Sequence, residues 1–466
     1  MIKFNFRLCL IALLSLAFIK CSSVSSEEDA KKGEEGILDS SSLIYEGESP
    51  SDRLSDNESN FYTNKITNTV VVATLNGDCS TEDSELLNQQ IATLSNNGGG
   101  VIRITKGTYC LKEVLLRSNI HIKIDSDVTI QPDLTGYVAG KNLNMFLVGE
   151  DFYVENVAIT NSDEDNTDVS TWFKGFIPAG DNIGVRFIEF GNVKNFKFSG
   201  LRLTDNYSKF SNIVLNFPSS ENADELSRDG IIKDIVMTGM HVGYGVVQMQ
   251  TGKNILYNNI DGQGGITLRI ETDVSSRIVK ENKPTVDGVV GRNIVSRFGD
   301  AALNMSPRRI DQGRVDIDGI TAINSTHAVQ IAAGYMNDKV TTATIINNGT
   351  FSTKSYIGDI TVTGGKGAQI KGKDFKYFNC DDREELILKC YNPDNESTPG
   401  ISIGVIRNSA AAEEGCNSED NGCYKIIIGR ITKTNTDFEQ DDFFTYPTDA
   451  IGGCSKVTKP SDGSCN

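Results

Sequence analysis

The chain has 466 residues and a formal net charge of −17, from 45 Lys and Arg residues against 62 Asp and Glu residues. This acidic balance argues against nucleic acid as a partner, because phosphate backbones are bound by basic surfaces. The length would ordinarily suggest two or three domains, unless the chain is a solenoid that grows by adding coils.

The first residues indicate export. Two basic residues precede a short apolar run from Leu8 to Ile19, and polar sequence follows. The run is too short to span a bilayer, so we predict a signal peptide over residues 1–20 and a secreted or cell-surface protein. Cys21 is a candidate for the lipid-bearing cysteine of a bacterial lipoprotein, which would anchor the protein in an outer membrane. Lys20 is unusual before such a cysteine, so free secretion is the alternative.

Residues 21–60 are rich in Ser, Glu, Asp and Gly, which predicts a disordered tether before one folded domain over residues 61–466. Eight cysteines follow Cys21, and an even number in an exported chain indicates disulfides, concentrated toward the C-terminal part. We expect local pairing: Cys79–Cys110, Cys380–Cys390, Cys416–Cys423 and Cys454–Cys465. Metal binding is the weaker interpretation, since no CxxC pair occurs and the chain has three histidines.

Residues 80–97 predict one amphipathic helix with Ser80 as its cap, Asp83 three residues later, and apolar residues on one side. These apolar residues are Leu86, Leu87, Ile91 and Leu94. A Gly-rich turn over residues 98–100 ends the helix. Short strands follow at Val101–Thr105, Ile122–Asp125 and Val128–Ile130, with a "GTY" turn before the second of them. The helix would cover the open end of a coil stack, as terminal repeats of solenoids must.

A degenerate repeat of short β segments then continues. The first strands of successive coils are expected at Ile235–Gly239, Ile255–Asn259, Val289–Asn293, Ile317–Thr321 and Ile360–Gly364, and the second strands at Val246–Met249, Ile266–Arg269, Ala301–Asn304, Ala328–Ile331 and Ala368–Lys371. The first interval is 20 residues and later ones are longer. Inward aliphatic residues with Gly, Asn and Asp corners predict an all-β fold, a right-handed parallel β-helix with an N-terminal capping helix. A β-sandwich is the rival fold.

The second strands carry the candidate chemistry. Alternation along residues 266–273 directs Arg269, Glu271 and Asp273 to the outer face. The outward residues expected on neighbouring strands are Gln248, Gln250, Asn304, Gln330, Gln369 and Lys371. Because stacked strands lie about 4.8 Å apart, these side chains should form one polar patch. A solvated outer face is ordinary for a β-helix and is the alternative. Two acids that share a strand with an arginine favour a site.

The spacing of the two acids favours one mechanism. Residues i and i+2 on a strand are about 6.6 to 6.8 Å apart. Glycosidases that invert hold their carboxyl groups roughly 6.5 to 9.5 Å apart, and retaining enzymes hold them at about 5 to 5.5 Å. The pair therefore favours an inverting sugar hydrolase. Arg269 favours the ionised form of Glu271, whereas Asp273 and a bound substrate favour the protonated form, so the two effects oppose each other.

The run Arg269-Ile-Glu271-Thr-Asp273, with Gln248 one coil earlier and a helix-capped start, resembles the iota-carrageenases, glycoside hydrolase family 82. The resemblance is sharpest over residues 230–310. It implies a marine bacterial endo-hydrolase that inverts while cutting β-1,4 linkages of the sulfated galactan iota-carrageenan. Glu271 would be the general acid, Asp273 the general base, and Gln248 a ligand of the attacking water. Sulfate and sugar contacts would come from Arg269, Gln250, Asn304, Arg308 and Gln330.

The resemblance also carries expectations about ions and one departure. The family associates calcium and chloride with the protein, while the chemistry itself needs no cofactor, and we expect a monomer. Family members use a histidine on a later coil near the site. The corresponding stretch here is Asn304–Arg309, and His327 lies one coil further. This departure puts the carry-over of water activation in doubt.

Charge and aromatic residues support a sulfated ligand. From Arg269 to Arg314 there are nine basic and six acidic side chains, a local balance of +3 within an acidic protein. Arginine forks suit sulfate, although a solvated loop of mixed charge is the alternative. Trp172, Phe173, Tyr244 and Tyr335 are candidates for stacking on sugar rings.

Rival functions would need other residues. A polygalacturonase-type hydrolase would show a GHG motif, which is absent, and a DD step near the site, whereas both DD steps lie toward the C-terminal end. A polysaccharide lyase would need calcium-binding acids and a basic residue, which Arg269, Glu271 and Asp273 could supply. A non-catalytic glycan-binding surface protein would keep the arginines and need neither carboxylate.

Overall fold

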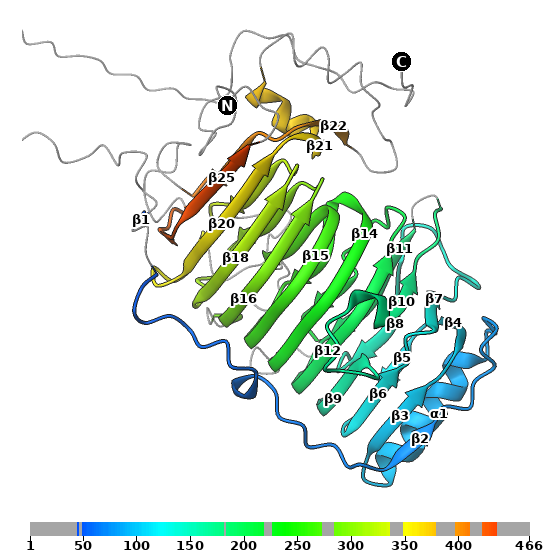
Figure 1. Ribbon diagram of the computed structural model, residues 1–466. Coiled ribbons are helices and arrows are strands. Elements are labelled where there is room, and N and C mark those ends of the chain that lie inside the picture. Colours follow the sequence, from blue (N-terminus) through cyan, green and yellow to red (C-terminus); the bar gives the residue numbers. More distant parts are fainter. Residues whose placement is uncertain are drawn as a thin grey trace, which may run out of the picture. The chain divides into compact units, whose positions relative to one another are not determined.

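The computed structural model describes residues 44–45, 49–180, 183–218, 226–272, 284–335, 348–378, 397–410 and 422–435. In this part of the chain, short strands wind into a right-handed parallel β-helix that begins at a capping helix (Figure 1). The predicted fold class is therefore confirmed. The predicted signal peptide and Cys21 lie outside the described residues. No helix among the described residues is both long enough and apolar enough to cross a membrane.

The coils build three stacks of parallel strands. Stack 1 contains β2 (Val70–Val72), β3 (Gly100–Ile104), β6 (Ile120–Ile124), β9 (Val154–Asn161), β12 (Val193–Thr204), β14 (Arg228–Met249), β15 (Gly252–Glu271), β16 (Val286–Arg297), β18 (Val315–Ile323), β20 (Tyr356–Gly364), β24 (Ile427–Ile428) and β1 (Ile44–Tyr45). Stack 2 contains β4 (Gly107–Leu111), β7 (Val128–Pro132), β10 (Phe173–Phe176), the later parts of β12, β14, β15, β16, β18 and β20, and β25 (Ile431–Asn435).

Stack 3 carries the residues singled out from the sequence. It contains β5 (Val114–Leu116), β8 (Asn142–Val148), β11 (Gly184–Phe190), β13 (Ile213–Leu215), the last parts of β14 and β15, β17 (Ala301–Ser306), β19 (His327–Ile331) and β23 (Gly404–Asn408). Its inward ladder Val247, Leu268, Leu303 and Val329 is fully buried and in register. Each such aliphatic side chain, if cut back to alanine, would cost about 2–5 kcal/mol. Register in this stack is thus fixed by the core.

The capping helix α1 (Asp83–Asn96) buries Leu87, Ile91 and Leu94 on the first coil. It begins later than predicted, because Glu82 is the residue before the first turn and no side chain caps it. The buried Asp83 instead accepts a hydrogen bond from the backbone of Asn76 at 2.7 Å. The predicted "GTY" turn is wrong: it is the start of strand β4.

Two details of the predicted repeat are wrong. Ile235 pairs with Ile260, so the first interval is 25 residues rather than 20. The strand β21 (Lys366–Ile370) leaves the coil and pairs antiparallel with β22 (Thr398–Ile401), so Gln369 and Lys371 do not continue the outer ladder of stack 3. Ala368 and Ile370 are buried in a separate small hydrophobic core, so they pack against apolar residues although they lie outside the coil.

An N-terminal strap, residues 49–66, runs along the outside of stack 1 from the last coils back to the first, shown in dark blue between β1 and β2 (Figure 1). Beneath it the outer face is apolar: Ile231, Leu256 and Val290 align on three successive coils and are buried by Phe61 of the strap. Strands covered on both faces lose the polar half of their alternation. The strap supplies this second cover.

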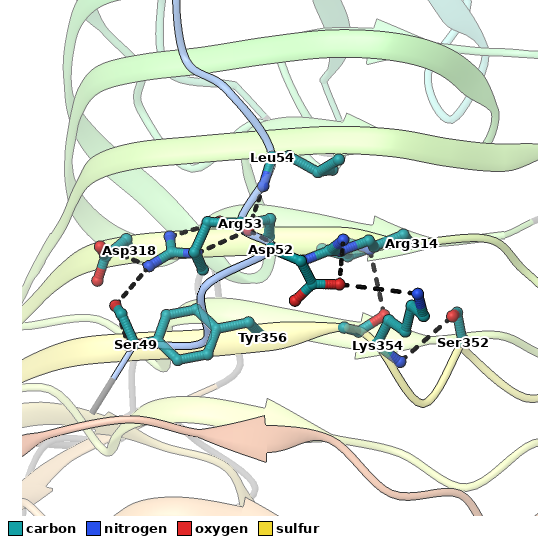
Figure 2. Close-up of polar contacts among 12 residues, drawn as sticks. Ser49, Asp52, Arg53, Leu54, Arg314, Asp318, Ser352, Lys354 and Tyr356 are labelled. Carbon is teal, nitrogen blue, oxygen red and sulfur yellow. Dashed lines mark hydrogen bonds and ion pairs between the residues drawn. The ribbon is translucent and has the colours of Figure 1, made fainter. Parts of the chain in front are cut away.

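Polar contacts fasten the strap (Figure 2). Arg53 binds the buried Asp316 through Nε at 2.7 Å and also reaches Asp318 at 3.1 Å. Asp52 lies 3.4 Å from Arg314 and 3.7 Å from Lys354. The prediction of a disordered tether is therefore wrong for residues 49–60, because covering the apolar ladder and pairing buried charges stabilises an ordered path. Residues 21–43 lie outside the described part.

One predicted disulfide, Cys79–Cys110, is confirmed, and it joins the segment before α1 to β4. Cys423 is also disulfide-bonded. The other predicted pairings involve Cys380, Cys390, Cys416, Cys454 and Cys465, which lie outside the described residues.

Candidate active site

An outer ladder of polar side chains crosses stack 3. Gln248 of β14 pairs in register with Arg269 of β15, which pairs with Asn304 of β17, and this residue pairs with Gln330 of β19. Neighbours in the ladder are therefore about 4.8 Å apart. Alternation places all of them opposite the buried core ladder. Gln250 follows Met249, whose partner is Ile270, and so lies beside Glu271.

Glu271 lies at the end of β15 between two arginines. One carboxylate oxygen contacts Arg269 on the same strand, and the other contacts Arg308 from the turn after β17. The Glu271 side chain is 15% exposed, and the arginine side chains are 13% and 18% exposed. Arg269 also donates to the backbone carbonyl of Gly243 at 2.8 Å. The trio is thus a partly buried cluster with two cations and one anion, open on one side to solvent.

Arg308 is held in an unusual way. Its backbone is left-handed (φ 57°), a conformation that bulky residues rarely adopt and that is concentrated at functional sites. Its guanidinium lies 4.7 Å from the centre of the Tyr335 ring. Burial, and then repulsion by Arg269, lowers the pKa of Arg308 to about 10. Arg308 therefore stays a cation at neutral pH, and an added anion would relieve the repulsion between the two arginines.

Behind the ladder lies a buried polar cluster. Gln330 is only 4% exposed and donates to Asp300 at 2.8 Å, while Asn304 donates to it at 3.4 Å. Lys371 pairs with the other oxygen of Asp300 at 2.5 Å. Burial opposes ionisation of Asp300, but Lys371 and neighbouring cations hold its pKa below the usual value. Gln330 was predicted to contact substrate, but in the structure it orients Asn304 and does not face solvent.

His327 is also part of this buried cluster. It is fully buried, and burial lowers its pKa to about 3, so it is neutral at ordinary pH. Its Nδ1 lies 3.5 Å from the amide nitrogen of Gln330. The residue that approaches Glu271 from the later coil is Arg308, where the sequence resemblance implied a histidine. This substitution places a permanent cation, rather than a titratable ring, next to the carboxylate.

Asp273, the predicted base, lies outside the described residues, as do three of the nine basic residues counted between Arg269 and Arg314. The other six do not form one patch. Arg292 and Arg314 face the strap on stack 1, and Arg297 pairs with Asp261. Arg309 is buried, which leaves Arg269 and Arg308 to face the site. Counting along the sequence overstated the basic charge at the site, because residues on different stacks of a coil face different sides of the molecule.

The aromatic candidates divide in the same way. Trp172 and Phe173 are buried in the fold, whereas Tyr335 is 41% exposed beside Arg308. Tyr244 is partly exposed and contacts the Phe210 ring at a centroid distance of 5.8 Å. Tyr335 and Tyr244 therefore remain as candidates for sugar contact, and the first two do not.

Two ladder positions were missed in the sequence. Arg407 of β23 pairs with Gln330 and continues the ladder beyond the insertions. Glu189 of β11 lies in register with Val214, which pairs with Gln248, and a buried ion pair joins it to Arg186. Alternation in each strand would have marked both as outward. Their register depends on loop lengths, which the repeat pattern did not fix.

The arrangement suits chemistry on an anionic ligand. The carboxylate of Glu271 lies between the cations of Arg269 and Arg308, and both cations can bind a sulfate oxygen in its place. Amide side chains lie on both sides of Arg269. The described residues contain no group of three or more His, Cys, Asp or Glu that could hold a metal ion. The calcium and chloride implied by the resemblance therefore stay predictions.

No protein-family model matches the chain. The chain is 27% identical over 418 residues to the iota-carrageenase of Zobellia galactanivorans, which covers 87% of this chain and 79% of that protein. It is 30% identical over 263 residues to the iota-carrageenase of Alteromonas macleodii, which covers 56% of this chain. The matched part is about half (51%) of the Alteromonas protein.

Solved structures agree with the fold. An iota-carrageenase of family GH82 from A. fortis, solved in the absence of chloride ions, has a TM-score of 0.74 at 22% identity and covers 89% of this chain and 98% of its own. An iota-carrageenase complexed to iota-carrageenan fragments has a TM-score of 0.73 at 21% identity and covers 89% and 99%. These likenesses show the β-helix. Over 87% of its length the chain is similar in sequence to an iota-carrageenase, and this similarity indicates a glycoside hydrolase.

Proposed function

We propose that the protein is an inverting endo-hydrolase that cuts β-1,4 linkages of iota-carrageenan. The observation that carries this proposal is Glu271, held between Arg269 and Arg308 beside a ladder of amide side chains. The curated relatives are named iota-carrageenases, and one solved relative is complexed to iota-carrageenan fragments. A sulfated galactan matches the two cations that flank the carboxylate.

In the proposed reaction, Glu271 donates its proton to the glycosidic oxygen as the bond from that oxygen to the anomeric carbon breaks. Asp273 takes a proton from a water whose oxygen bonds to the anomeric carbon from the opposite face. Gln248 hydrogen-bonds this water from the previous coil. The assignment of Asp273 rests on the i, i+2 alternation with Glu271.

The arginines have a second part in this proposal. Without substrate, both guanidinium groups contact the carboxyl group of Glu271. A sulfate group that binds Arg269 and Arg308 would replace Glu271 as their partner and free its carboxyl group to face the glycosidic oxygen. An unsulfated galactan would leave both contacts in place.

The remaining sequence predictions complete the proposal. The protein would be exported through the signal peptide over residues 1–20, either secreted or anchored through Cys21. It would act as a monomer and need no cofactor for the chemistry.

The experiment is incubation of the purified protein with iota-, kappa- and lambda-carrageenan and with pectin. We expect new reducing ends with iota-carrageenan, a first product of inverted anomeric configuration by NMR, and no ultraviolet absorbance from unsaturated sugar. Glu271→Gln should lower kcat by at least about a hundredfold, the lower end of what general-acid catalysis supplies. Full activity of Glu271→Gln would overturn the assignment of the acid.

The same assay tests a lyase, in which a basic residue would abstract a proton. Arg308 has a lowered pKa, but at about 10 it remains protonated at neutral pH, which favours a role in anion binding. An unsaturated product would show that the protein cleaves by elimination and is a lyase rather than a hydrolase. Binding without any cleavage would indicate a glycan-binding protein.

A further inference from the structure

A cavity lies away from the candidate active site, at the corner where the coils pass from stack 2 to stack 3. It has a volume of about 350 Å³, and its walls include Tyr207, Gly239, Gln263 and Phe298 from successive coils, with Gln369 of β21. We call it the corner pocket. Cavities of roughly 300–1,000 Å³ are the usual size for small ligands. Gly265 at this corner is six positions from Glu271 on β15, which is about 20 Å along the strand.

The two aromatic walls are held in a disfavoured backbone conformation. Tyr207 has φ 61° and Phe298 has φ 52°, and L residues with large side chains rarely adopt such angles. Ten of the fifteen non-glycine residues with positive φ that the structure describes are Asn or Asp, which tolerate it. Tyr207 and Phe298 are the aromatic residues among the fifteen, and both line the corner pocket.

The disfavoured backbone angles of Tyr207 and Phe298 do not bury their side chains. Tyr207 is 37% exposed and Phe298 is 40% exposed, so neither ring fills the core. Gly367 (φ 92°) stands where an added Cβ would lie 3.1 Å from the Phe298 ring, so a glycine leaves room for the aromatic wall. Unfavourable backbone angles that gain no packing are concentrated where ligands bind.

The polar groups of the pocket suit an uncharged ligand. The floor is rigid, because Gln369 accepts from the backbone of Gly265 at 2.6 Å and donates to the carbonyl of Met240 at 3.1 Å. Gln263 is exposed, and its amide makes no hydrogen bond to any residue that the structure describes. Among the described residues that line the pocket there is no Asp, Glu, Lys or Arg. Two apolar ring faces with one unengaged amide match a pyranose ring and its hydroxyl groups rather than a sulfate.

We propose that the corner pocket is a second, non-catalytic polysaccharide-binding site, in which Tyr207 and Phe298 stack on a pyranose ring and Gln263 hydrogen-bonds its hydroxyls. The identity of the polysaccharide, iota-carrageenan, rests on the proposed function; the site itself does not. A chain held here keeps the protein on the polymer while another stretch of polymer contacts the site around Glu271.

The test compares the affinity of full-length variants for iota-carrageenan by native gel electrophoresis in gels that contain the polysaccharide, all in a Glu271→Gln background. The pocket variant is Tyr207→Asn with Phe298→Asn, since asparagine suits the left-handed backbone and should preserve the fold. The control is Phe152→Asn with Tyr153→Asn, which removes two aromatics of similar exposure, 44% and 42%, elsewhere on the surface. Gln263→Ala is a second variant that alters no backbone preference.

We expect the pocket variant to bind about tenfold more weakly or worse, Gln263→Ala roughly threefold more weakly, and the control within twofold of the parent. With Glu271 restored, the pocket variant should keep its rate on short soluble oligosaccharides. If the gel retards the pocket variant as strongly as the parent, or if the control loses as much affinity, the pocket proposal is overturned, and cleavage by the protein with Glu271 would still support the proposed function.

If retardation depends on the pocket but the protein with Glu271 produces no reducing ends, the proposed function is overturned and the binding site stands. If there is neither retardation nor cleavage, both proposals are overturned.

Discussion

The surroundings of Glu271 in the structure differ from those that the sequence predicted. In the sequence it has one arginine neighbour, Arg269; in the folded chain it has two, because the turn after β17 returns Arg308 to it. Alternation predicted that Gln248, Arg269 and Glu271 would face outward together, and they do. It could not predict that Arg308 binds Glu271, because that contact depends on a left-handed turn after Pro307 rather than on any period.

Arg308→Lys tests whether the planar fork matters at this site. Lysine keeps the charge but loses the two-pronged geometry and the contact with Tyr335. We expect kcat/KM on iota-carrageenan to fall roughly ten- to a hundredfold, mainly through KM. Arg103→Lys, an exposed arginine of the first coils paired with Asp125, is the matched control and should leave the kinetics unchanged. Equal kinetics for Arg308→Lys and wild type would contradict a sulfate-binding role.

Asp205 gives a pH prediction. It is buried, and burial raises its pKa to about 7, although it accepts hydrogen bonds from the backbone of Ser208 and from Asn212. The unfolded chain loses this proton near pH 4, whereas the folded protein keeps it up to about pH 7. The free energy of unfolding should therefore fall as pH rises from about 4 to 7, and the loss persists above that range.

Asp205→Asn should remove this loss, so that at pH 8 the variant is more stable than the wild type by roughly 1–3 kcal/mol. Asn212 can turn its amide to accept from the new side chain, because its own carbonyl oxygen is unpaired among the described residues. Urea unfolding at pH 5 and pH 8 measures the difference. A variant that is less stable than the wild type at both values would show that the carboxylate is needed as an acceptor.

At the scale of elements, the sequence predicts the coils better than their register. Period-two alternation and Gly or Asn corners predicted the β-helix and four strand segments of stack 3, at residues 246–249, 266–269, 301–304 and 328–331. The fifth predicted segment, residues 368–371, lies outside that stack. The path of the strap was missed because its partners lie far away: Arg53 and Asp316 are 263 residues apart. A signal did exist in the apolar doublets at Ile231, Leu256 and Val290, whose outward members needed a cover.

The strap should contribute measurably to stability. Arg53→Met removes the residue that pairs with the fully buried Asp316, although Arg292 still lies 3.1 Å away and neutralises part of that charge. We expect the free energy of unfolding to fall by roughly 2–4 kcal/mol, in line with other broken buried ion pairs. Arg103→Met breaks a half-exposed pair and should cost below about 1 kcal/mol. Similar losses in both variants would mean that the strap adds little.

At the scale of the whole molecule, the protein is acidic and its proposed substrate is a polyanion. The net charge of −17 repels the polymer at long range, whereas Arg269 and Arg308 attract sulfate only at contact. Raising the ionic strength from about 10 mM to 150 mM shortens the screening length from roughly 30 Å to 8 Å. We therefore expect kcat/KM on iota-carrageenan to rise over this range. A steady fall from the lowest salt would show that local cations dominate the encounter.

The strap also sets an order of events during synthesis. Its residues leave the ribosome before the coils do, and Asp316, Asp318 and Tyr356 are made 263 to 307 residues after their partners in the strap. Phe61 cannot complete its packing until Val290 has been made, and Arg53 has no buried carboxylate to bind until Asp316 has been made, so the apolar outer ladder stays open to solvent until then. Because β1 pairs with β24, the earliest strand joins one of the last. A chain released before β18 is made would lack Asp316 and Asp318, and an outer ladder without its fastened strap would distinguish it from the finished protein.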